Sequence, residues 1–65
     1  MSSREEKIAS YKALIDLHNG NIRFELHFHL RSEAERKRLI GRERCEIKEL
    51  EALIKQLEAA EENDP

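Results

Sequence analysis

The chain has 65 residues and a net charge of −2 at neutral pH; 40% of its residues are charged and only 5% are aromatic. A chain of this length buries only about 60% of its unfolded surface, and the single cysteine, Cys45, excludes a disulfide within the chain. This composition is typical of helices with charged surfaces rather than of a large globular core. We therefore expect one small domain over residues 1–65 that is stabilised by association with other copies of itself.

The sequence also indicates a cellular compartment. It contains neither a signal peptide nor a long apolar run, so we expect no contact with membranes. A lone cysteine is typical of a reducing compartment, which favours the cytoplasm.

Charge is distributed unevenly along the chain. Residues 31–44 contain six basic and three acidic side chains, whereas residues 45–65 contain two basic and seven acidic ones. The whole chain is therefore not typical of a nucleic-acid-binding protein, although its basic segment alone could suit one.

The first predicted element is a helix over residues 3–18. Ser3 and Glu6 form a capping-box pattern, and Asn19-Gly20 is typical of the residues that end a helix. Between them, apolar and aromatic side chains recur at helical spacing at Ile8, Tyr11, Leu14, Ile15 and His18. Asn-Gly is also a strong β-hairpin signal, so a strand over residues 14–18 is the alternative. The apolar run 13–15 breaks the alternation that such a strand needs.

The second predicted element is a half-buried strand over residues 21–31, where apolar and polar residues alternate without interruption. The sequence contains no convincing second strand, and a lone strand leaves its backbone groups unpaired. We therefore expect it to pair with the same strand of another copy. A two-fold axis at Leu26 would place Phe24 opposite Phe28 of that copy and keep apolar residues together.

The third predicted element is a long helix over residues 33–62, followed by a frayed tail at 63–65. Ser32 and Glu35 form a second capping box. Apolar residues then follow the heptad pattern of a coiled coil, which Arg36 and Glu43 interrupt. Gly41 is either tolerated on the helix surface or marks a kink between two shorter helices. The basic start and acidic end of this helix favour antiparallel pairing with a second copy.

The predicted fold class is α+β and mostly helical. The expected assembly is an intertwined homodimer, or a dimer of dimers, held by an intermolecular antiparallel β-ribbon and by antiparallel helix pairing. The predicted dimer interface consists of Ile22, Phe24, Leu26, Phe28, Leu30, Ile40, Ile47, Leu50, Ile54 and Leu57.

Few residues suggest chemistry. His27 and His29 share a face of the predicted strand, as some zinc ligands do, but a third ligand is not evident, so we expect no metal and no cofactor. The same histidines could instead make an interface sensitive to pH. No nucleophile and base set and no phosphate loop are present, so we expect a protein without enzymatic activity.

The predicted function is that of a small homo-oligomeric regulatory or adaptor protein that binds another protein. A strand followed by helices that are divided at Gly41 also resembles a ribbon-helix-helix repressor. That resemblance implies a dimeric DNA-binding regulator whose polar strand face enters the major groove. The candidate partner surface is Arg23, Glu25, His27, His29, Arg31, Arg36 and Arg38.

Overall fold

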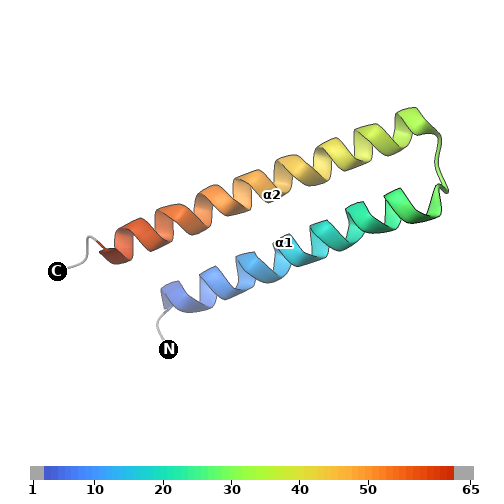
Figure 1. Cartoon of the computed structure of the whole chain (residues 1–65). Helices are drawn as coiled ribbons and strands as arrows, with labels where there is room; N and C mark the ends of the chain where they lie inside the picture. The colour runs from blue at the N-terminus through green and yellow to red at the C-terminus, as the bar shows by residue number, and fades with distance from the viewer. Residues whose placement is uncertain (1–2, 63–65) are drawn as a thin grey trace.

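The computed structural model describes residues 3–62, which form a helical hairpin (Figure 1). Helix α1 spans Ser3–Phe28 and helix α2 spans Glu33–Glu62. The two helices run antiparallel, with the connection 29–32 at one end and the start of α1 and the end of α2 at the other (Figure 1). The molecule measures 52 × 18 × 12 Å along its principal axes, so it is a rod that is only one pair of helices thick.

The predicted strand over residues 21–31 is wrong. Helix α1 continues through Asn19 and Gly20 to Phe28, and the described residues contain no strand. The α+β class, the intermolecular β-ribbon and the strand register centred on Leu26 are therefore also wrong. The structure is a pair of packed helices.

The reason lies in a longer pattern that runs through the same residues. A helix pairs its backbone groups internally, whereas a lone strand needs a partner for them. The buried and half-buried side chains of α1 recur at alternating spacings of four and three, and this pattern is typical of a helix that packs against one other helix. These residues are Arg4, Ile8, Tyr11, Ile15, His18, Ile22 and Glu25.

Helix α1 ends at Phe28, and the residue after it is His29 rather than Gly20. His29 has a φ of 47°, the left-handed conformation that commonly follows the last residue of a helix. Gly20 lies inside the helix, where an added Cβ would meet nothing within 4 Å. Phe24 and Phe28, one turn apart, pack their rings with centroids 4.6 Å apart.

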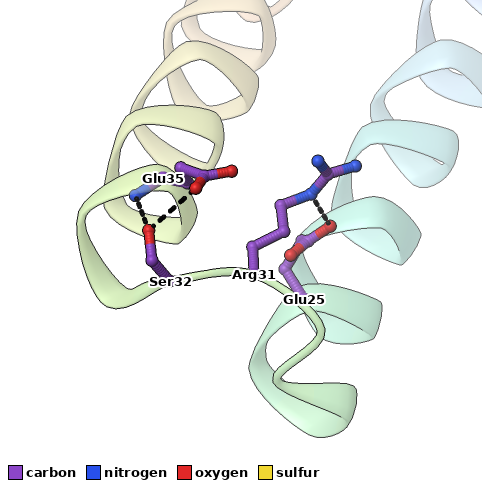
Figure 2. A network of polar contacts seen from close by, with 4 residues as sticks. All are labelled: Glu25, Arg31, Ser32 and Glu35. Carbon is purple, nitrogen blue, oxygen red and sulfur yellow. Dashed lines mark hydrogen bonds and ion pairs between the residues drawn. The ribbon is translucent and has the colours of Figure 1, made fainter.

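Helix α2 has the bounds that its sequence predicts. The Ser32 hydroxyl accepts a hydrogen bond from the Glu35 amide at 3.2 Å and donates one to Glu35 Oε1 at 3.1 Å (Figure 2). The Ser32 carbonyl accepts from the Arg36 amide at 2.9 Å. The helix passes through Gly41 without a break, so Gly41 does not divide it into two shorter helices. The predicted frayed tail at 63–65 lies outside the described residues.

The core is a single seam between the helices. On α2 the seam residues repeat with the same spacing as on α1, and they are Arg36, Ile40, Glu43, Ile47, Leu50, Ile54 and Leu57. No described side chain is less than 2% exposed. The helices therefore cover each other along one stripe and leave their remaining surface open.

Candidate interaction surfaces

The seam divides the outer surface of the hairpin into two flanks. An α-helix turns by about 100° per residue, so residues one position before a seam residue lie on one flank and residues one position after lie on the other. When two antiparallel helices are viewed from the same end, successive residues turn clockwise in one helix and counterclockwise in the other. In this antiparallel pair, corresponding positions of α1 and α2 therefore lie on the same flank.

The flank that precedes the seam residues carries most of the exposed large apolar side chains, and we call it the apolar face. Its large apolar side chains are Leu14, Leu17, Phe24 and Phe28 on α1 and Leu39 and Leu53 on α2, and polar residues such as Lys7, Arg42, Glu46 and Glu49 lie on the same flank. Seven large apolar side chains are exposed among the described residues, and five of them lie here, at 40% to 59% exposure. Only Leu39 of this face is half-buried.

The flank that follows the seam residues is charged, and we call it the charged face. Its residues include Lys12, Asp16, Arg23 and Leu26 on α1 and Lys37, Gly41, Arg44, Lys48, Glu51 and Lys55 on α2. Leu26, which is 52% exposed, is its one large exposed apolar side chain within the described residues. It lies in a shallow hollow that Arg23 and His27 also line.

A second hollow, which we call the arginine cleft, lies near the connection. It is lined by Arg31, Glu35, Arg38, Leu39 and Arg42. Three arginines and one glutamate thus line this hollow together with one apolar side chain. Through Leu39 the cleft is continuous with the apolar face.

A buried carboxylate positions one of these arginines. Glu25 is 5% exposed, and its Oε1 accepts a hydrogen bond from Arg31 Nε at 3.0 Å (Figure 2). Its second oxygen, Oε2, is buried without a hydrogen-bond partner among the described residues. Because a buried carboxylate is costly without a counterion, this contact holds Arg31 against the end of α1.

A second polar pair lies within the seam itself. The His18 ring nitrogen Nδ1 contacts Glu43 Oε2, and both side chains are largely buried. Glu43 interrupts the apolar heptads of α2 in the sequence, and the structure shows that it faces a polar residue of α1. His18 and Glu43 face each other in only one alignment of α1 against α2. The pair therefore favours this alignment over shifted ones.

The predicted dimer interface is divided between several places. Ile22, Ile40, Leu50 and Ile54 are buried in the seam between α1 and α2, where Ile47 and Leu57 are half-buried. Phe24 and Phe28 lie on the apolar face, Leu26 on the charged face, and Leu30 is exposed in the connection. Contact of these residues with a second chain stays a prediction.

The predicted partner surface is also divided. Arg31 and Arg38 line the arginine cleft, and Arg23 and His27 line the hollow around Leu26. An exposed contact joins Arg36 to His29 Nδ1. Glu25 is buried, so it offers little surface to a partner.

The structure also bears on the metal and DNA alternatives. Within residues 3–62, no group of three or more His, Cys, Asp or Glu side chains is placed to hold a metal ion. His27 packs edge-on against Phe28, with ring centroids 4.9 Å apart.

The ribbon that a ribbon-helix-helix protein inserts into DNA is absent from the described part, because this segment is helical to Phe28. In the same part, neither helix combines the length and apolarity that a bilayer crossing needs.

Two signals in the sequence could have revealed these surfaces. The flanks become visible only when α1 is continued past Gly20, because Phe24 and Phe28 share a flank with Leu14 and Leu17 only in a helix. Pairing the polar seam residues of both helices would then have indicated a hairpin. No family profile, curated protein or solved structure matches this chain, so its surfaces are interpreted from their own geometry.

Proposed function

We propose that this chain is a small, non-enzymatic adaptor or regulatory protein that associates with itself through the apolar face and binds another protein with its remaining surface. One observation carries this proposal. Among the described residues, five of the seven exposed large apolar side chains gather on one flank of the hairpin, and the other flank has one.

The thin core supports the proposal. A pair of helices with no fully buried side chain in its described part has little apolar burial to offset the entropy of folding. Fully burying a Leu or Phe side chain contributes about 1.5–3 kcal/mol. Covering the apolar face would therefore stabilise the folded hairpin as well as the assembly.

The charge distribution favours a second copy as the occupant of this face. The hairpin is basic near its connection, through Arg36, Lys37, Arg38 and Arg42, and α2 is acidic toward its far end. A second copy in antiparallel orientation would place each basic end beside an acidic end. The charged face would stay open to a different protein, and we propose the hollow that Leu26 lines with Arg23 and His27 as its contact point. The exposed free thiol of Cys45 fits a reducing cytoplasm.

Light scattering after size exclusion, over a range of concentrations, tests the proposal. We expect the wild-type chain to reach at least the mass of a dimer. Leu17→Lys should shift the mass toward the monomer, because it places a charge within the apolar face. Leu26→Lys is the matched control, since Leu26 is similarly exposed on the charged face, and it should leave the mass unchanged.

Circular dichroism verifies that both variants remain helical. A wild-type chain that is monomeric at every concentration would contradict the proposal. Equal effects of the two substitutions would show that the apolar face is not the contact surface.

A further inference from the structure

We propose that the arginine cleft is the docking site for the acidic half of α2 from a second copy, in a symmetric antiparallel dimer. In this arrangement Leu53 of the second copy lies on Leu39, and Glu49 of the second copy faces Arg42. The inference rests on the proposed self-association and specifies its geometry.

The cleft itself indicates the chemistry of its occupant. Arg38 and Arg42 are one turn apart on α2, a spacing at which like charges destabilise a helix. Glu25 holds Arg31 near them through Nε, which leaves the terminal nitrogens of this guanidinium able to donate elsewhere (Figure 2). Leu39 supplies an apolar contact in the same hollow. A suitable occupant therefore combines an apolar side chain with a neighbouring carboxylate.

The other half of the same helix carries this combination on the same flank. Leu53 is 40% exposed, and Glu49, one turn before it, is also exposed. Leu39 and Leu53 lie at equal distances along the chain on either side of Glu46. A two-fold axis that passes over Glu46 therefore brings Leu39 onto Leu53 of the second copy, and by symmetry the reverse contact forms as well.

The same axis has consequences for α1. The antiparallel register of the hairpin places the level of Glu46 between Leu14 and Leu17 of α1. Leu14 of each copy would then contact Leu17 of the other copy. Phe24 would lie beside Lys7 of the second copy, a pair suited to a cation–π contact.

The axis also brings the two copies of Glu46 near each other. Two carboxylates at an interface repel, so this position opposes association in the wild-type chain. Arg42, one turn earlier on the same flank, offsets part of this repulsion. Removing the charge at Glu46 should therefore strengthen the dimer, which is unusual for the loss of a charged side chain.

A charge swap between chains tests the geometry. Arg42→Glu and Glu49→Arg should each weaken the dimer roughly tenfold, because each variant faces like charge in its own homodimer. An equimolar mixture of the two variants should form a heterodimer, since the glutamate introduced at position 42 of one chain then faces the arginine introduced at position 49 of the other. Native mass spectrometry distinguishes this heterodimer from both homodimers by mass.

The matched control is the pair Arg44→Glu and Glu51→Arg, which makes the same charge changes on the charged face. These variants should associate as the wild type does, with no preference for the heterodimer. Glu46→Gln adds a conservative test and should tighten the dimer severalfold.

The outcomes separate the two proposals. Two outcomes would overturn the cleft geometry but not self-association, provided that the wild-type chain is a dimer. The first is that the charge-swapped chains show no preference for each other. The second is that Glu46→Gln weakens the dimer. A monomeric wild-type chain would overturn both.

Discussion

The two flanks of the hairpin belong to the same two helices, yet they differ sharply in composition. The apolar face exposes Leu14, Leu17, Phe24, Phe28 and Leu53, whereas the charged face exposes Leu26 among lysines, arginines and acidic residues. Both flanks lie equally far from the seam, so the folding of the hairpin does not require the difference. The comparison is therefore the basis of our proposal that the apolar face contacts a second copy of the chain.

The same comparison applies to the polar residues near the connection. On the side of the apolar face, Arg31, Arg38 and Arg42 converge on one cleft. On the charged face, Lys37 instead pairs with Glu33 at 3.5 Å, an exposed contact one turn away in the same helix. The three arginines near the apolar face thus line a shared hollow. Lys37 on the charged face instead forms an ion pair within its own helix.

The largest effect should come from removing the aromatic part of the apolar face. Replacing Phe24 and Phe28 together by Ser should weaken self-association by at least about tenfold, because each ring is about half exposed in the hairpin and would bury apolar area in the proposed dimer. Sedimentation equilibrium measures the change. The matched control, Leu26→Ser with Leu30→Ser, removes two exposed apolar side chains outside that face. A control that weakens association as much as the test variant would remove the distinction between the flanks.

A smaller effect should follow from the loss of Arg31. Arg31→Ala deprives the buried carboxylate of Glu25 of the hydrogen-bond donor that the structure gives it, so we expect the hairpin to lose about 1–3 kcal/mol of stability. Urea denaturation monitored by circular dichroism gives this value. Adding Glu25→Leu to the same chain should restore most of the stability, because a buried pair can be replaced by apolar side chains. No recovery in the double variant would show that Arg31 contributes through other contacts.

The two glycines should respond in the opposite direction. Gly20→Ala and Gly41→Ala should each stabilise the hairpin by about 1 kcal/mol, because both glycines lie within helices and a Cβ meets nothing within 4 Å. Thermal or urea unfolding measures the change. Gly20 is the more informative position, since a left-handed residue after a helix would make alanine destabilising. Gly41 is on the charged face, so its substitution should not alter association.

The smallest effect should come from the exposed ion pair on the charged face. Lys37→Ala removes its contact with Glu33, and both side chains are more than 70% exposed. We expect a loss of about 0.3–0.5 kcal/mol, which high salt should abolish. Association should not change. A marked loss of association would assign Lys37 to an interface and weaken the contrast between the faces.

How far the sequence predicts this fold depends on the segment. The capping residues Ser32 and Glu35 and the heptads that follow predicted α2 from Glu33 to Glu62, as the structure has it. The first part of α1 was also predicted as helix. The segment after Gly20 was predicted as strand because five apolar residues alternate with polar ones there, a pattern that a short window cannot distinguish from one part of a longer helical repeat.

The surfaces were less predictable, for a physical reason. Glu25 and Glu43 occupy seam positions but are charged, so the apolar pattern alone breaks at both of them. Their roles depend on the residue that faces them from the other helix, which requires the tertiary register. The apolar face depends on the same knowledge, because Leu39 and Leu53 join it only when α2 packs antiparallel to α1.

Chemical-shift changes on dilution would test the central claim most directly, namely that the apolar face is the surface through which copies of this chain associate. Methyl and aromatic NMR signals would be followed as the protein is diluted. We predict that signals of Leu14, Leu17, Phe24, Phe28 and Leu53 move with concentration while those of Leu26 stay fixed. Movement of Leu26 with the apolar face unchanged, or no movement at any concentration, would contradict this claim.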